Sequence, residues 1–186
     1  MPLYTDMKKT FKLTLTAILC ALAIALNFLE GQLPPMPFLP PGAKPGFSNI
    51  ITMFAAGSLG FPQAVAIALV KGLFSFVTRG ATAGIMSLSG GILSAIAMYF
   101  LMRFARTRLG LIGISVICAL FHNLGQLAAA MFITSTSSIA YYAPALALFG
   151  IVTGAVTGVI LRAVIPALEK IKKQTAELFQ KSRKYQ

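Results

Sequence analysis

The stretch ALVKGLFSFVTRG, residues 68–80, places two cationic side chains in an otherwise apolar part of the chain. Lys71 lies in the middle of an apolar run, and Arg79 follows eight residues later. A charged side chain inside an apolar segment is costly if that segment crosses a membrane, so its position is informative about function. The surrounding sequence has to establish whether this segment does cross a membrane.

The bulk composition indicates an integral membrane protein. Hydrophobic residues make up 57% of the 186 residues and charged residues only 11%, and the mean hydropathy is +0.82. A soluble fold of this size cannot bury so much apolar surface. The net charge of +12 would suggest a nucleic acid partner in a soluble protein. Here the basic residues lie mostly at the ends of apolar segments, so a membrane explains them and no nucleic acid partner is expected.

Six apolar segments are candidate membrane-spanning helices, and they predict an all-α, six-helix integral membrane bundle. Their approximate ranges are 11–29, 47–60, 62–79, 84–102, 109–133 and 142–165. The second is short for a spanning helix and shares a tight turn, at Gly60 to Pro62, with the third. We assign residues 1–166 to the membrane domain and residues 167–186 to a tail. The basic start of residues 7–25 could alternatively belong to a secretory signal.

The distribution of lysine and arginine predicts that both termini are cytoplasmic. Basic clusters precede the first segment, fill the loop around residues 103–108 and follow the last segment. The first, third and fifth loops hold little more than Lys44 and Arg79. An even number of spans brings all the clusters to one side, and this side is normally the cytoplasm.

Two flanking segments have their own patterns. The first loop, residues 31–46, carries six of the ten prolines and predicts a stiff, extended external segment, which could be a connector or a lid over a site. The tail repeats apolar residues at helical spacing with lysines between them, which predicts an amphipathic helix on the anionic inner leaflet.

Polar side chains gather in the outer halves of the expected spans, whereas the inner halves are almost purely apolar. Lys71 shares a helical face with the small residues at 64, 68, 75 and 78, so it should point into the bundle. This distribution predicts an outward-facing binding cavity closed below by an apolar plug. The candidate substrate-binding residues are Asn27, Glu30, Asn49, Lys71, Arg79, Ser89, Gly90, His122, Asn123 and Gln126.

These candidates also have structural interpretations. Lys71 could pair with Glu30, and Arg79 could simply lie at the membrane interface. The polar cluster at 122–126 could tie helices together, and the glycines at 90–91 could be a close-packing point.

A functional site would use these residues in distinct roles. Lys71, assisted by Arg79 and Lys44, would neutralise an anionic group on a ligand that enters from outside. The cluster at 122–126 would bind the polar edge of that ligand. The aromatic residues that could pack on its apolar part are Phe47, Phe74 and Phe121.

The sequence lacks the motifs of several enzyme classes. It has no G-x-x-x-x-G-K-[ST] loop, so we expect no ATPase activity of its own. Its four acidic residues, Asp6, Glu30, Glu169 and Glu177, are scattered, whereas magnesium-dependent diphosphate chemistry needs clustered carboxylates. The single histidine has no carboxylate clearly near it for a nucleophile triad. We expect no catalytic residue, no cofactor and no metal site.

One helical face of the first span is made of small residues. Ala17, Ala21 and Ala25 recur every four residues and form a smooth stripe on which another helix can lie closely. This stripe is a candidate partner-binding surface.

Three motifs carry a family resemblance: KPGFSNIITMFAAGSLGFPQA (44–64), SLSGGILSAIAM (87–98) and FHNLGQL (121–127). In this order they resemble the membrane family labelled heptaprenyl diphosphate synthase component I, also called the Gx transporter family. That family in turn resembles the substrate-binding (S) components of energy-coupling factor (ECF) transporters. The resemblance covers roughly residues 10–165.

The resemblance implies a six-helix S-component fold in the bacterial cytoplasmic membrane. An S component captures a small nutrient from outside and docks on a transmembrane (T) component driven by two ABC ATPases. The alanine stripe at residues 17, 21 and 25 matches the small-residue motif of that contact, and the first external loop commonly gates the site.

We therefore expect the S subunit of an ECF-type importer for a small anionic vitamin-like molecule or a quinone or isoprenoid precursor. The alternative is a non-catalytic membrane subunit associated with heptaprenyl diphosphate synthase in polyprenyl and menaquinone biosynthesis. A stand-alone facilitator is a third option.

Overall fold

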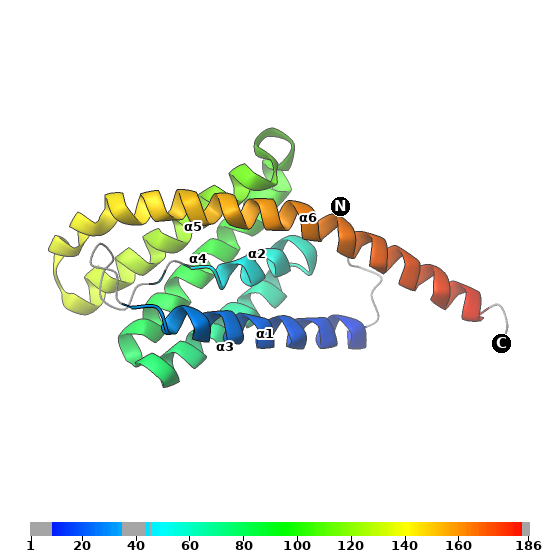
Figure 1. Cartoon of the computed structure of the whole chain (residues 1–186), viewed down its shortest axis with the longest axis horizontal. Helices are drawn as coiled ribbons and strands as arrows, with labels where there is room; N and C mark the ends of the chain where they lie inside the picture. The colour runs from blue at the N-terminus through cyan, green and yellow to red at the C-terminus, as the bar shows by residue number, and fades with distance from the viewer. Residues whose placement is uncertain (1–8, 35–43, 45, 184–186) are drawn as a thin grey trace.

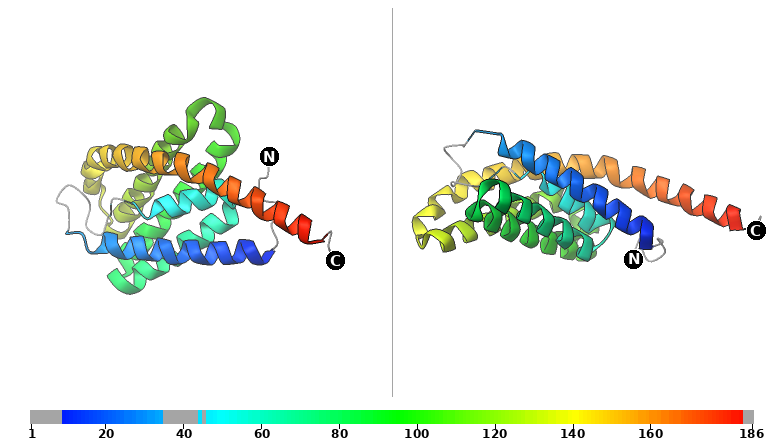
Figure 2. Two further views of the ribbon diagram at one scale, coloured as in Figure 1. Left: turned by 45° about the vertical axis from the view of Figure 1, so that its right-hand side comes forward. Right: turned by 90° about the horizontal axis from the view of Figure 1, so that it is seen from below.

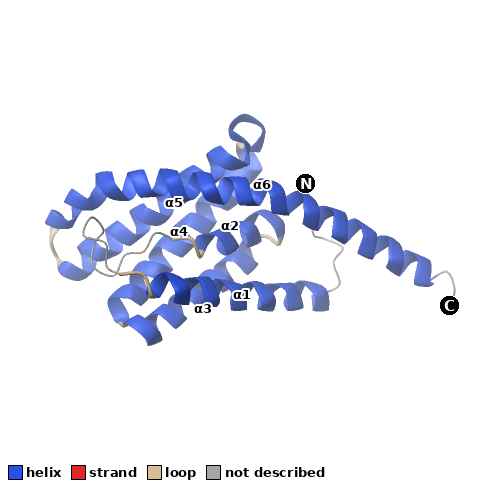
Figure 3. Ribbon diagram, in the orientation of Figure 1, coloured by secondary structure: helices blue, strands red, loops and turns tan. Residues whose placement is uncertain are grey.

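The computed structural model of the chain describes the backbone of residues 9–34, 44 and 46–183, and within it the side chains of residues 11–34, 44, 46–166 and 170. The regular structure in this part is helical throughout (Figure 3). In chain order the helices are α1 (Lys9–Gly31), α2 (Asn49–Ser58), α3 (Phe61–Arg79), α4 (Ala81–Phe104), α5 (Arg106–Thr134), the short 3-10 helix η1 (Ser137–Tyr142) and α6 (Ala143–Arg183).

Five helical segments in the described part are long and apolar enough to cross a membrane. They are Phe11–Gly31, Phe61–Arg79, Ala81–Phe104, Arg106–Thr134 and Ser137–Pro166. The predicted all-helical membrane fold is therefore confirmed.

The second predicted span is wrong as a membrane-crossing helix. Helix α2 has only 10 residues, which corresponds to about 15 Å, or half of the roughly 30 Å hydrocarbon core. Gly60, with a φ of 110°, ends the segment, and α3 begins directly after it at Phe61, with Pro62 in its first turn. At the other end, residues 46–48 are non-helical and approach the start of α2 as a turn. The described part thus holds six α-helices but five helices of spanning length.

The helices run back and forth between two ends of the bundle (Figure 1). The start of α1, the α2–α3 turn and the end of α6 lie toward the right in Figure 1, whereas the α3–α4 turn lies at the left. That turn is a single residue, Gly80, whose positive φ of 89° reverses the chain between two helices. The cytoplasmic location of the α1 start and the α6 end stays a prediction from the positive charges.

Helix α1 lies at the margin of the bundle (Figure 2). Its contacts go to α2 and α3, and its inward face carries Leu19, Ala23 and Asn27, which are all buried. The opposite face carries the alanine stripe of residues 17, 21 and 25, and all three alanines are exposed. No other part of the described chain therefore covers the stripe.

An apolar core fills the half of the bundle away from the α3–α4 turn. Met53, Ile67, Met98, Ile114 and Leu161 are almost fully buried in it. This core corresponds to the apolar plug that the sequence predicts below the polar residues.

Two predictions fall partly outside the described residues. The proline-rich residues 35–43 and 45 are not described, so the choice between connector and lid is not tested. The tail has the predicted helical backbone as far as Arg183, but its side chains, Lys170 excepted, lie outside the described part. The division into a membrane domain and a tail therefore stays a prediction.

Glycines allow α5 and α6 to approach closely. A Cβ atom on Gly154 would lie 2.5 Å from Val116 Cα, and one on Gly158 would lie 2.5 Å from Ile112 Cα. These neighbours are backbone atoms, which cannot move aside as a flexible side chain can. At these two positions α5 and α6 lie so close together that a side chain larger than that of glycine does not fit.

We predict that Gly154→Ala destabilises the protein, because the added methyl group must push α5 and α6 apart. The expected loss is about 1–3 kcal/mol, seen as a fall of several degrees in the melting temperature of the purified protein. Gly113→Ala is the matched control, since a Cβ there would meet only Leu109 Cβ at an ordinary 3.4 Å. Equal melting temperatures for the two variants would contradict the packing argument.

Candidate functional site

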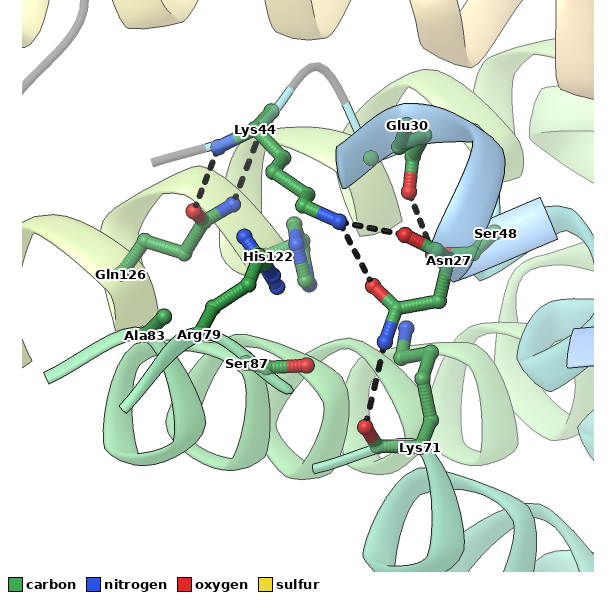
Figure 4. A pocket seen from close by; sticks show the side chains of 11 residues that line it. Asn27, Glu30, Lys44, Ser48, Lys71, Arg79, Ala83, Ser87, His122 and Gln126 are labelled. Atoms are coloured by element: carbon green, nitrogen blue, oxygen red, sulfur yellow. Dashed lines mark hydrogen bonds between the residues drawn. The ribbon is translucent and has the colours of Figure 1, made fainter. Parts of the chain in front are cut away.

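A polar pocket lies among α1, α3, α4, α5 and the segment that leads into α2 (Figure 4). The side chains leave a free volume of only about 10 Å³, roughly the room for one water molecule. The lining residues are Asn27, Glu30, Lys44, Gly46, Ser48, Lys71, Arg79, Ala83, Ser87, His122 and Gln126. Six of the ten candidate substrate-binding residues are thus brought together.

Lys71 is the most deeply buried charged residue of the described part, with 1% of its surface exposed. Of its predicted neighbours on the same face of α3, Ala64, Ala68 and Ser75 are also fully buried, whereas Thr78 is exposed. The ammonium group donates a hydrogen bond to Asn49 Oδ1 at 2.5 Å. Asn49 does not line the pocket, but it holds the head of Lys71 from the first residue of α2. Among the described residues this is the one hydrogen bond recorded for the ammonium group, which has three donors.

Glu30 is occupied by the segment that begins α2. One carboxylate oxygen accepts a hydrogen bond from the backbone N–H of Phe47, and the other accepts one from Ser48 Oγ at 2.7 Å. Both oxygens thus hold the start of α2, and in the described part of the chain Glu30 forms no direct ion pair with Lys71.

Lys44 joins α5 to α1 across the pocket (Figure 4). Its backbone N–H donates to Gln126 Oε1 at 3.2 Å, and its carbonyl accepts from Gln126 Nε2 at 3.4 Å. Its ammonium donates to the backbone oxygen of Asn27 and to Asn27 Oδ1, the latter at 3.1 Å.

The pKa of Lys44 is lowered from the ordinary 10.5 to about 8, chiefly by burial and then by the nearby cations Arg79 and Lys71, while Glu30 acts in the opposite direction. The group is therefore mostly charged at neutral pH and loses its charge as the pH rises through about 8.

Arg79 completes the cationic set from the end of α3. Its Nη2 donates to Ser75 Oγ at 2.9 Å, and the same hydroxyl accepts from Asn27 Nδ2 at 2.7 Å. Arg79 and Lys44 both lie against Gly31, because a Cβ placed there would be 3.3 Å from Lys44 Nζ and 4.0 Å from Arg79 Nε. The pocket lining thus holds three cationic side chains and one carboxylate.

His122 forms the α5 wall of the pocket. Gly90 on α4 packs directly against it, since a Cβ on Gly90 would lie 2.7 Å from both the backbone oxygen and Nδ1 of His122. Gly46, with a φ of 87°, lies on another side, where a Cβ on it would be 3.3 Å from His122 Cδ2. The buried Nδ1 has no hydrogen-bond partner within normal geometry among the described residues, and it lies on the side of the ring that packs against Gly90.

Four candidates lie outside the pocket lining, and two of them have clear structural partners elsewhere. Asn123 donates from Nδ2 to the carbonyl of Leu146 at 2.6 Å and thereby ties α5 to α6. The carbonyl of Ser89 lies against Gly125, at 2.8 Å from where a Cβ would be. Asn49 accepts a hydrogen bond from Lys71, and Gly90 packs against His122, as described above. The three candidate aromatic residues, at 47, 74 and 121, do not line the pocket either.

Several lining residues were not among the ten candidates. Lys44 was named only as an assisting cation, because loop residues carry no periodicity that would orient them. Ser48 and Ser87 lie inside the motifs 44–64 and 87–98, and Ala83 lies one turn before Ser87 on α4. Gly46 follows a proline in the loop, where its positive φ could not be read from spacing.

Comparison with known proteins gives one family and one fold. A family model described as heptaprenyl diphosphate synthase component I matches residues 19–164. The fold is similar to the solved structure of the S component of a bacterial ECF transporter, with a TM-score of 0.68 and 20% sequence identity. The similarity covers 89% of this chain and 99% of that one. No curated protein matches the sequence significantly.

We predict that Glu30→Gln lowers the melting temperature, because an amide replaces one of the two acceptor oxygens that Phe47 N–H and Ser48 Oγ use by an NH2 donor, and because the loss of charge leaves the cations less balanced. The expected cost is about 1.5–3 kcal/mol. Ser48→Ala is the control, since it removes one of the two bonds and keeps the charge. A Glu30→Gln protein as stable as Ser48→Ala would show that the carboxylate does not hold this segment.

Proposed function

The chain belongs to the heptaprenyl diphosphate synthase component I family, and on this basis we propose that it is the membrane substrate-binding subunit of an ECF-type importer. It captures a small anionic molecule from outside, of the vitamin-like or quinone and isoprenoid precursor classes. The observation that carries the proposal is the pocket itself: three cationic side chains and one carboxylate, with neutral amides and hydroxyls between them, at one end of a bundle whose other half is apolar.

Within this function the pocket residues have separate roles. Lys71 and Arg79 bind the anionic group of the ligand, and Lys44 assists them from the segment before α2. His122 and Gln126 bind the polar edge. Asn49 and Glu30 position the cations and the start of α2 without being the primary contacts.

The exposed alanine stripe of α1 supports a partner contact. Ala17, Ala21 and Ala25 face away from the rest of the bundle. Their small side chains allow the backbone of a neighbouring helix to approach α1 closely. On this proposal the neighbour belongs to a T component, which two ABC ATPases drive. The chain itself is not an enzyme, since its scattered acidic residues do not provide the carboxylate cluster that prenyl diphosphate chemistry needs.

The name of the family favours one alternative. Its description as a component of heptaprenyl diphosphate synthase would fit a non-catalytic membrane subunit that recruits a soluble synthase in polyprenyl and menaquinone synthesis. The two functions differ in their partners, and this difference provides the test.

We predict that the tagged protein, purified gently from its native membrane, brings down a multi-span partner and two ATPases, identified by mass spectrometry. Ala21→Trp should abolish this copurification without lowering the melting temperature, because a bulky side chain prevents close helix approach. Val77→Trp, at an exposed position of α3 (84% exposed), is the matched control and should retain the partners. A prenyl synthase in stoichiometric amount without ATPases would favour the alternative and contradict the importer.

A further inference from the structure

The charges around the pocket do not balance. Helix α3 contributes Lys71 and Arg79, the segment before α2 contributes Lys44, and α1 contributes Glu30. Helix α4 contributes only Ala83 and Ser87, which are uncharged, and α5 contributes His122 and Gln126. With the imidazole neutral, the lining therefore carries three positive charges against one negative charge.

The hydrogen bonds within the pocket do not neutralise this surplus. The described partners of the three cationic groups are the amide oxygens of Asn49 and Asn27, the backbone oxygen of Asn27 and the hydroxyl of Ser75, all of them neutral. The only carboxylate in the lining, that of Glu30, is engaged by Phe47 and Ser48. The cations are thus solvated by dipoles and lack a counter-charge in direct contact.

Such a surplus is costly in this location. Lys71 is 1% exposed, and the apolar core begins directly below the pocket. Charges removed from water are tolerated when they are paired, and an anionic oxygen is a stronger acceptor for an ammonium than a neutral amide is. A bound anion of matching charge would satisfy the spare donors of Lys71 and Arg79.

We infer that the ligand of this pocket carries two negative charges on a compact head group, as a tetrahedral phosphate ester or a dicarboxylate does. The inference rests on the proposed function of the pocket as the substrate site, and it narrows the class of substrate. The small free volume requires the head group to take the place of neutral partners such as Asn27 beside the ammonium of Lys44.

Two pairs of probe anions test the charge requirement. Sulfate and methyl sulfate are similar tetrahedral anions that differ by one charge, and succinate and monomethyl succinate do the same for carboxylates. The purified protein is melted at about pH 7, where Lys44 is charged, in each anion at equal ionic strength. At least one dianion should raise the melting temperature by about 3–6 °C more than its monoanion partner. Which pair responds distinguishes a tetrahedral head group from a dicarboxylate.

A variant series separates binding from general salt effects. Arg79→Gln reduces the surplus to one charge and should abolish the preference for the dianion, bringing the two melting temperatures of each pair to within about 1 °C. Arg103→Gln removes one charge at the exposed end of α4, away from the pocket, and should leave the preference intact.

Three results would overturn the inference: equal shifts by dianion and monoanion, no shift by any anion, or a preference that persists in Arg79→Gln. None of these three results depends on which proteins bind the chain, because the copurification experiment determines those protein partners separately. An importer complex found together with a monoanion preference would leave the proposed function standing and refute the dianion. A synthase in place of the ATPases would refute the proposed function whatever the anions do.

Discussion

A fully buried lysine in an apolar helix is the constraint on which the rest of this structure depends. Lys71 can be accommodated only if the surrounding helices supply polar atoms at its depth, and they do so from several directions. Asn49 at the start of α2 accepts from its ammonium, and Asn27 of α1 donates to its carbonyl at 3.2 Å. The segment that precedes α2 makes further contacts at this end of the bundle, with Glu30 and with Gln126.

The polar network also explains why the pocket is so nearly filled. Asn27 contacts Lys44, Lys71 and Ser75 at once, so it links the loop segment to both α1 and α3. Neutral amides and hydroxyls lie beside the cations. On the proposed function, a ligand with a stronger acceptor takes their places, and the apolar core beneath limits how deeply it can enter.

The sequence predicted the helical membrane fold, because the apolar composition indicates a membrane protein and the length of the apolar segments indicates helices. It also predicted the side of α3 that faces the bundle, since helical periodicity places Lys71 with Ala64, Ala68 and Ser75. It overestimated α2 as a spanning helix, because an apolar run is equally compatible with a short helix that is preceded by a turn. Lys44 was named only as an assisting cation, because the position of a loop residue cannot be predicted from helical spacing. Asn123 was placed in the site, because the rotation of α5 against α6 depends on tertiary contacts that the spacing of residues does not reveal.

The most direct test of the central claim, that this pocket holds an external small molecule, is to identify what the protein retains. The wild type and Lys71→Met would be purified in parallel under mild conditions, and the molecules extracted from each would be compared by mass spectrometry, with melting curves to establish that both are folded. The account predicts one small anionic compound that is enriched with the wild type and depleted about tenfold or more in the variant, since a charge-assisted contact is lost. No enriched compound, or equal amounts with both folded proteins, would contradict it.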